Sequence, residues 1–242
     1  MTDHPIAFSA PMVAALRAGT KTQTRRILNP QPYSPQSVVS YDPRSGNWMS
    51  CEPSPATGGT RQMDPCRPIR IRVGDRLWVR ESYYQLGHWK PVLDCWTKGG
   101  RQKWAFVPDG EMILFREPQD EIRLGRHSAD PGAVRWHKRL GRFMPRSASR
   151  MSLIVTDVRV ERLQSISHAD ALAEGVEMES ADPPFYYVPG IWPHSITAVG
   201  VEDGKDHAQR SYAKLWDYIN GTGAWAENPW VVAYTFEVER AQ

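Results

Sequence analysis

The residue types best suited to chemistry lie together near the start of the chain. Lys21, Thr24, Arg25 and Arg26 supply an amine, a hydroxyl and two guanidinium groups within one short segment. A Thr hydroxyl becomes a nucleophile only when an adjacent base takes its proton, and a Lys amine is such a base only when its pKa is lowered. Burial and the two Arg charges would lower the pKa of Lys21. The segment therefore joins a candidate base and nucleophile to anion-binding groups.

The spacing of Lys21 and Thr24 makes this chemistry depend on the backbone. Residues three apart face opposite sides of a straight strand but share one side of a turn or helical arc. If the segment curls, Lys21 and Thr24 meet. If it runs extended, Thr22 and Thr24 share a face without the Lys. The alternative interpretation is a polar loop that follows a helix.

A short helix over residues 10–18 is predicted to position this segment. Ser9 can cap it, Pro11 suits the first turn, and Gly19 ends it. The apolar side of this helix, which includes Met12 and Leu16, should pack on a larger body.

A second candidate residue lies far along the chain. The sequence Ser167-x-x-Asp170 predicts the start of a short helix over 169–174, which Gly175 ends. Glu174 then lies at the helix C-terminus, where a carboxylate is electrostatically unfavourable. Such a position raises the question of a function, but solvent-exposed Glu residues are common at helix ends, and without other evidence that interpretation is preferred.

Length and composition indicate a globular protein. The chain has 242 residues, is 40% hydrophobic and contains ten Trp. It has no apolar run of membrane-spanning length, and its N-terminus lacks the features of a signal peptide, so we expect a cytoplasmic protein with no membrane partner.

The net charge of +3 hides an uneven distribution. Residues 1–150 hold 24 Lys and Arg against 13 Asp and Glu, whereas residues 151–242 hold 6 against 14, giving +11 and −8. A basic surface of this kind favours a polyanion such as RNA, although charges spread over solvated faces give the same count.

Neither a metal nor a cofactor is predicted. Cys51, Cys66 and Cys95 are widely spaced and form no Cys-x-x-Cys motif. Pairs such as His127 with His137, or His88 with Cys95, are more typical of surface or core residues than of metal ligands.

The rest of the pattern favours an α+β fold with several strands and few helices, built as a small β-barrel with helices at its rim. Residues 30–68 are predicted to be a long loop or a partly ordered insertion, of which some packs down. The other predicted elements are two strands at 69–73 and 76–81, a hairpin of 103–107 and 112–116 in a β-rich middle of the chain, a bulged central strand at 151–163, a helix at 207–219 and a half-buried strand at 229–240. Between these elements, residues 135–146 interleave cations with aromatic side chains, as single-strand binders do and as an ordinary Arg-rich loop also does.

Several segments together resemble the ASCH domains of the PUA-like superfamily, especially the longer phage and prophage members. They are Phe8-Ser-x-Pro-Met-Val, Ala18-Gly19-x-Lys21-Thr-x-Thr24-Arg25-Arg26, Gly74-Asp75-x-Leu-Trp-Val-Arg-Glu81, Met144-Pro-Arg-x-Ala-Ser-Arg150, Ala171-x-Ala-Glu174-Gly175, Leu215-Trp216 and Asn228-Pro-Trp230. The resemblance implies one PUA-like domain over residues 1–242, a β-barrel flanked by helices, with insertions at about 30–68, 85–130 and 180–205.

The resemblance also implies a role in RNA handling. Small bacterial members are amidohydrolases of N4-acetylcytidine that use a Lys, a Thr and a Glu, which correspond here to Lys21, Thr24 and Glu174. Another member is described as a ribonuclease, so fold alone does not fix the reaction. We therefore expect a metal-independent amidohydrolase acting on an N4-acylated cytidine or a related modified nucleoside. The alternatives are a non-catalytic module that binds RNA or modified nucleic acid, and a ribonuclease.

Further residues are predicted to bind the substrate or nucleic acid. Guanidinium groups would hold phosphate, an indole would stack on a base, and a carboxylate would pair with an Arg or bind an exocyclic amine. Each is also a plausible structural residue. They are Arg25, Arg26, Trp78, Arg80, Glu81 and Arg146.

Overall fold

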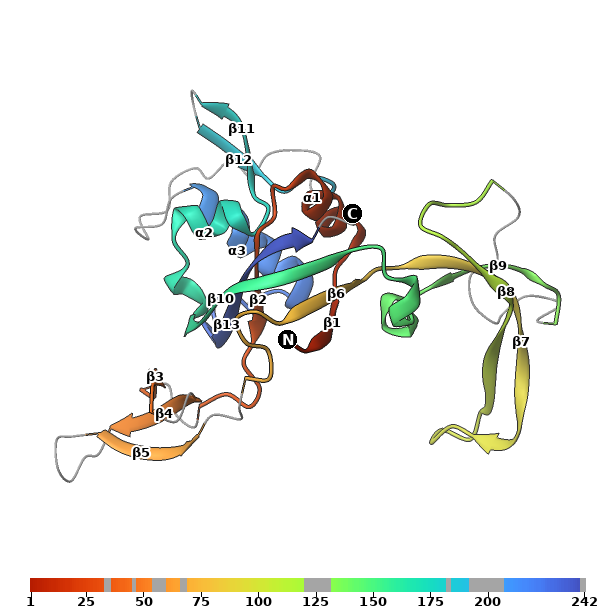
Figure 1. The fold of residues 1–242 in the computed structure, drawn as a ribbon, viewed down its shortest axis with the longest axis horizontal. Helices are drawn as coiled ribbons and strands as arrows, with labels where there is room; N and C mark the ends of the chain where they lie inside the picture. The colour runs from red at the N-terminus through yellow and green to blue at the C-terminus, as the bar shows by residue number, and fades with distance from the viewer. Residues whose placement is uncertain are drawn as a thin grey trace. The chain divides into compact units, whose positions relative to one another are not determined.

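The computed structural model describes residues 1–32, 36–44, 47–53, 60–65, 69–119, 132–181, 184–191 and 207–239. Side chains are not described at 47, 52, 53, 60–65, 180, 181, 184 and 185. The fold is mixed α+β, rich in strands and with few helices, as predicted (Figure 1).

The largest sheet has five strands in the order β1-β6-β10-β13-β2. Their bounds are β1 Asp3–Ala7, β2 Gln23–Ile27, β6 Arg76–Arg80, β10 Ser152–Arg162 and β13 Trp230–Glu239. In this order β1 and β2 are the two edges, so the described strands form an open sheet and not the predicted closed barrel.

The two longest strands of this sheet, β10 and β13, run antiparallel beside each other (Figure 1). Their register shifts between Val155 and Asp157, which confirms the bulge predicted for this strand. The strand predicted at 229–240 is present, but the expectation that it is half-buried is wrong. Residues 230–234 are all buried, because β13 lies between β10 and β2 and both of its faces are covered.

The helices match the sequence closely. They are α1 Ala10–Ala18, α2 His168–Ala173 and α3 His207–Asn220, with short 3₁₀ helices at Gly141–Phe143, Arg146–Ala148 and Leu163–Ser165. In α1 the buried side chains are Met12, Val13, Ala15 and Leu16. Gly19 follows with a φ of 80°, a conformation that glycine adopts without strain.

Among the described residues, three smaller sheets lie outside the five-stranded sheet, and one of them forms the β-rich middle of the chain that the sequence predicts. They are β3 Val38–Asp42, β4 Asn47–Pro53 and β5 Thr60–Pro65 in one sheet, β7 Tyr83–Trp96, β8 Gln102–Leu114 and β9 Arg135–Arg139 in another, and β11 Glu177–Ala181 with β12 Pro184–Tyr187. Of the two structures predicted for residues 30–68, a long loop is wrong where β3, β4 and β5 form, and a partly ordered insertion agrees with these strands. Cross-strand pairing stabilises this segment although its sequence lacks clear alternation.

The predicted hairpin of 103–107 and 112–116 is also wrong. Pro108 and Gly110 lie inside the single strand β8, whose partner is β7. Gln85 pairs with Ile113 and Gly87 pairs with Pro108, so β8 accommodates the extra residues as an irregularity instead of turning back.

The predicted strand at 69–73 is not formed. Asp75 accepts a hydrogen bond from the backbone N–H of Arg72 at 3.0 Å and donates its own N–H to the Arg72 carbonyl at 3.0 Å. These local bonds hold residues 69–75 as a loop that closes at Gly74, where φ is 86°.

Two compact units make up the chain. Unit 1 comprises Met1–His4, Pro11–Leu77 and Met151–Gln242, and unit 2 comprises Pro5–Ala10 and Trp78–Arg150. The single domain with three insertions stays a prediction. Among the described residues, no helix is both long and apolar enough to cross a membrane.

Candidate functional site

The structure brings Lys21 and Glu174 into direct contact inside unit 1. Lys21 Nζ donates to Glu174 Oε2 at 2.7 Å and to the Glu174 carbonyl oxygen at 2.7 Å. Only 2% of the Lys21 surface and 3% of the Glu174 surface is exposed. Because so little solvent reaches them, each charge depends on the other for compensation.

The backbone around Lys21 is held from three sides. The N–H groups of Thr20 and Lys21 donate to the Ala15 carbonyl at the end of α1. The next N–H, that of Thr22, donates to the Ala173 carbonyl at the end of α2, and Lys21 and Glu174 form an isolated β-bridge. The Thr22 carbonyl in turn accepts from Phe236 of β13 at 2.9 Å. The segment is therefore fixed between two helix ends and the sheet.

The local structure of α2 places Glu174 at this point. Ser167 and Asp170 form the predicted capping box, and Glu174 is the C-cap residue. Gly175 follows with a φ of 96°, and a Cβ added there would lie 3.6 Å from Lys21 Cβ. That distance is an ordinary van der Waals contact, so glycine is favoured here by the left-handed backbone that ends the helix and not by lack of space.

Arg25 adds a second cation to the same cluster. Its Nη1 lies 3.4 Å from Glu174 Oε1, and its Nη2 lies 2.7 Å from Glu161 Oε1 and 3.1 Å from Asp170 Oδ2. The Arg25 side chain is fully buried. It was predicted to bind substrate, and its guanidinium is occupied here by carboxylates of the protein itself.

The electrostatics of the cluster follow from burial. Burial lowers the pKa of Lys21, against the opposing charge and hydrogen bond of Glu174, and the Arg26 and Arg25 charges lower it further. Burial also raises the pKa of Tyr212 well above its usual value, and its hydroxyl donates to Glu174 Oε1 at 3.4 Å.

Asp170 connects this cluster to neighbouring elements. It accepts hydrogen bonds from Arg159 Nη2 at 2.8 Å and from Gln23 Nε2 at 2.9 Å. Burial alone would raise its pKa, but these hydrogen bonds and the Arg25 charge hold it well below the usual range. Its carboxylate is therefore a stable anion.

Thr24 lies next to the cluster but not in it. Residues 23–27 form the extended strand β2, in which successive side chains point to opposite faces. Arg25 donates to Gln23 across one face, so the Thr24 side chain leaves on the other face. Thr24 is buried, and within the described part of the chain its hydroxyl makes no hydrogen bond to Lys21 or Glu174. The segment is extended, not curled.

The Lys21–Glu174 pair can do two things chemically. A proton that crosses the 2.7 Å between Nζ and Oε2 converts an ammonium and a carboxylate into an amine and a carboxylic acid. Burial lowers the pKa of Lys21, and its amine form would be a base in direct contact with the Glu174 carboxyl group. The pair also has a structural effect, since the Lys21 ammonium satisfies a carbonyl at the C-terminus of α2.

The remaining predicted residues divide between the units. Arg26 is exposed on β2 in unit 1. In unit 2 the guanidinium groups of Arg80 and Arg146 lie 5.3 and 5.9 Å from the centre of the Trp78 ring. Arg80 Nε also donates to the Gly141 carbonyl at 3.1 Å. Trp78 is half-buried beneath these cations.

Glu81, in unit 2, pairs with Arg150. The Arg150 Nε and Nη2 atoms donate to the two Glu81 oxygens at 2.8 and 2.9 Å, a bidentate arrangement. Only 5% of Glu81 is exposed, whereas the Arg150 side chain is 36% exposed. The predicted pairing of Glu81 with an Arg thus occurs.

The basic stretch at 135–146 stacks its cations on aromatic rings. The Arg139 guanidinium lies 4.1 Å from the centre of the Phe106 ring and 5.0 Å from that of Phe143. Arg142 also lies 5.0 Å from the Phe143 ring, which is 52% exposed. His137 is buried beside them and accepts a hydrogen bond from Trp89 Nε1 at 3.3 Å.

Potential metal ligands are not grouped in the described residues, where no cluster of three or more His, Cys, Asp or Glu is placed to hold an ion. Two residues considered as ligands from the sequence, Cys66 and His127, lie outside the described residues.

Sequence reasoning missed the partners that complete the cluster. The sequence indicates Asp170 only as part of a helix cap and Tyr212 only as a residue of the helix predicted at 207–219, and it does not single out Glu161. Glu161 lies on β10, which also carries Asp157, Arg159 and Arg162, so its sequence context did not distinguish it from a surface charge.

Comparisons of the chain with protein-family models, with curated proteins and with solved structures gave no match.

Proposed function

We propose that the chain is a metal-independent amidohydrolase that removes an acyl group from N4 of a cytidine or a related modified nucleoside. One observation carries the proposal: the buried contact of Lys21 Nζ with Glu174 Oε2 at 2.7 Å, between residues 153 positions apart. Hydrolysis of an amide needs a base for the nucleophile and an acid for the departing nitrogen, and this pair supplies both. The resemblance to ASCH amidohydrolases supports the same roles for Lys21, Thr24 and Glu174.

In the proposed reaction Lys21, as the amine, takes the proton of the Thr24 hydroxyl while that oxygen attacks the acyl carbonyl. The bond from the carbonyl carbon to N4 breaks, and N4 leaves with the proton of Glu174. Water then attacks the ester on Thr24 and gives a proton to Glu174, while Lys21 returns its proton to the Thr24 oxygen. The products are cytidine and a carboxylic acid, and the enzyme regains its first state.

The proposal requires Thr24 to move toward Lys21 when substrate is bound. The two side chains share no hydrogen bond in the described structure, and catalytic hydrogen bonds commonly form only in the substrate complex. This requirement makes Thr24 the residue whose substitution is most informative.

The test is to incubate the protein with N4-acetylcytidine and measure release of cytidine. We expect turnover in the wild-type protein and a loss of at least about 100-fold in Thr24→Val and Lys21→Met, since general base catalysis contributes about that much. Thr22→Val is the matched control. Thr22 is exposed and contributes only backbone hydrogen bonds to the site, so this variant should retain wild-type turnover.

Three outcomes would overturn the proposal. One is the absence of turnover by folded wild-type protein. Another is equal turnover in wild type, Thr24→Val and Lys21→Met. The third is degradation of unmodified RNA that the same substitutions abolish, which would instead support a ribonuclease.

A specific observation favours a second candidate, a non-catalytic RNA-binding module. Unit 2 carries 14 Lys and Arg against 8 Asp and Glu, and several of its cations stack on aromatic rings around the exposed Phe143. Cations beside exposed aromatic rings bind phosphates and bases together. RNA binding without cleavage or deacylation would support this candidate.

A further inference from the structure

Unit 1 contains a pocket that the proposed amidohydrolase does not use. It has a volume of about 510 Å³ and is lined by Tyr41, Trp48, Ile69, Ile71, Arg72, Val73 and Val158. None of these residues belongs to the Lys21–Glu174 cluster. The volume falls in the range of pockets that hold small molecules.

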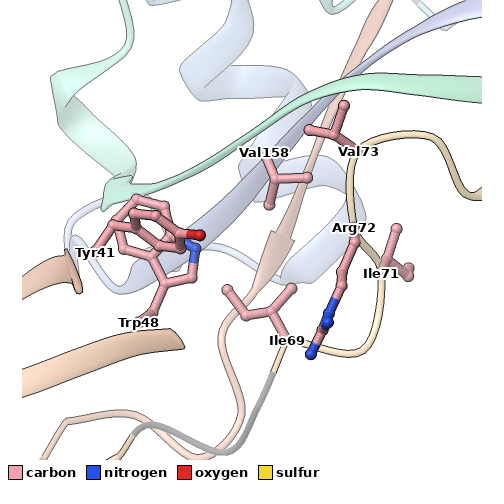
Figure 2. A pocket seen from close by; sticks show the side chains of 7 residues that line it. All are labelled: Tyr41, Trp48, Ile69, Ile71, Arg72, Val73 and Val158. Atoms are coloured by element: carbon pink, nitrogen blue, oxygen red, sulfur yellow. The ribbon is translucent and has the colours of Figure 1, made fainter. Parts of the chain in front are cut away.

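The walls of the pocket come from β3, β4, the loop at 69–73 and β10 (Figure 2). Tyr41 and Trp48 form one side and are a cross-strand pair of β3 and β4, with ring centres 5.5 Å apart. The loop residues Ile69 and Arg72 lie opposite them, and Val158 of β10 lies above (Figure 2). Two aromatic rings facing aliphatic side chains suit a flat aromatic ligand.

Arg72 adds a positive charge at the edge of this apolar space. It is exposed, and its guanidinium makes no hydrogen bond or ion pair within the part of the chain that the structure describes. Its backbone is held by Asp75, so the loop that presents the side chain is fixed before any ligand arrives. A free guanidinium beside an aromatic pocket suits the anionic group of the same ligand.

A second hollow continues from the first across the same loop. It has a volume of about 560 Å³, shares Ile69, Arg72 and Val73 with the pocket, and adds Arg70. Asp75 also lines it, but this carboxylate already accepts from the Thr2 and Arg72 backbone at 2.7 and 3.0 Å and contacts His4 at 3.4 Å. The two exposed Arg side chains therefore determine the charge available to a ligand there.

We propose that this pocket binds a nucleotide, with the base against Tyr41 and Trp48 and the phosphate at Arg72. Base stacking on aromatic rings and phosphate pairing with Arg are the two interactions that such a ligand needs, and here they lie on either side of one opening. The same chemistry is offered by a free nucleoside monophosphate and by the phosphorylated end of an RNA strand. The site is independent of the proposed amidohydrolase.

Isothermal titration calorimetry with AMP and CMP tests the proposal. We expect at least one of them to bind with a dissociation constant below about 1 mM, and the corresponding nucleoside and ribose 5-phosphate to bind at least about tenfold more weakly, because each lacks one of the two interactions. A 5′-phosphorylated RNA trinucleotide and its hydroxyl-ended form identify the source: tighter binding of the phosphorylated strand than of the mononucleotide indicates a strand end.

Variants locate the binding site. Arg72→Gln should weaken nucleotide binding about tenfold and leave nucleoside binding unchanged, because only the phosphate contact is lost. Tyr41→Leu should weaken both by at least about fivefold, whereas Tyr41→Phe keeps the ring and the affinity. Arg44→Gln removes the same charge from an exposed position outside the pocket and serves as the matched control.

The proposal is overturned if neither nucleotide binds, or if Arg72→Gln binds like Arg44→Gln. It is also overturned if Tyr41→Leu retains full affinity while circular dichroism shows the wild-type fold. Turnover of N4-acetylcytidine, if present, should be unchanged in Arg72→Gln, so failure of this site and failure of the amidohydrolase are separate results.

Discussion

At the scale of single residues, the unusual feature is a Lys and a Glu that meet where solvent hardly reaches. Two buried charges lose their hydration, and only close contact and further hydrogen bonds compensate for that loss. Here Lys21 gives two hydrogen bonds to Glu174, and Arg25 and Tyr212 lie 3.4 Å from the other Glu174 oxygen. The pair is thus fully surrounded by polar partners, as an acid–base pair and a structural ion pair both require.

A double-variant experiment measures the structural contribution of this pair. Lys21→Met leaves Glu174 buried without its nearest cation and should lower the free energy of unfolding by about 3–5 kcal/mol. Lys21→Met combined with Glu174→Gln removes both charges and should recover a large part of this loss. Urea denaturation followed by circular dichroism measures both. Equal stability of wild type and Lys21→Met would show that the contact does not stabilise the fold.

At the scale of elements, the site depends on where two helices end. The end of α1 is readable from the sequence because Gly19 follows an apolar helical pattern, and the end of α2 is readable from its capping box and Gly175. What lies beside each end is not readable, because the bridge between Lys21 and Glu174 joins residues 153 positions apart. The sequence around Lys21 and Thr24 is compatible with either a turn or a strand. Pairing with β13 makes β2, the part of this segment from Gln23 onward, extended.

Asp170 links α2 to β2 and β10, and its effect should depend on pH. Its pKa is lower in the folded protein than the ordinary value of 3.8, so the folded carboxylate binds protons less readily than the unfolded one. The stability it contributes is therefore complete above about pH 3.8 and is lost as the pH falls through the lower folded value. Asp170→Asn should be less stable at pH 7 by about 1–3 kcal/mol and should lose stability less steeply in acid.

Urea denaturation from pH 7 down to pH 2.5 measures this effect. Asp157→Asn is a control on β10, because the Asp157 side chain is half exposed and, among the described residues, forms an ion pair only with Arg159, at 3.3 Å. The free energy of unfolding of Asp157→Asn should fall with decreasing pH as steeply as that of wild type. If wild type and Asp170→Asn lose stability equally steeply as the pH falls, Asp170 does not have the lowered pKa described here.

At the scale of the whole molecule, positive charge is concentrated in unit 2. This unit has a net charge of +6, from 14 Lys and Arg against 8 Asp and Glu, whereas the remainder of the chain has 16 against 19, or −3. In the sequence, residues 1–150 are the basic part of the chain. Several basic residues of this part, including Lys21, belong to unit 1 in the structure, where carboxylates neutralise them.

RNA binding by unit 2 would be sensitive to salt. If Arg139 and Arg142 contact phosphates of a single-stranded RNA, replacing both by Gln should reduce the slope of log K against log salt concentration by about 1.4, or about 0.7 for each contact. The full chain and a fluorescent oligouridylate are suitable for this measurement by anisotropy. Arg17 is an exposed residue of α1 in unit 1. Arg17→Gln is therefore a single-charge control and should leave the slope unchanged. An unchanged slope in the double variant would exclude these phosphate contacts.

The sequence by itself determined the local structure of this protein: the bounds of α1, the capping box of α2, the bulge in β10 and the residue types of Lys21, Thr24 and Glu174. These features arise from interactions between residues close in the chain, so the residue types and their spacing in the sequence indicate them directly. Only the tertiary structure decided that Lys21 pairs with Glu174, that Arg25 is enclosed by carboxylates and that Thr24 faces away from them. Strand pairing and burial act between distant segments, and the energies of buried charges depend on those neighbours.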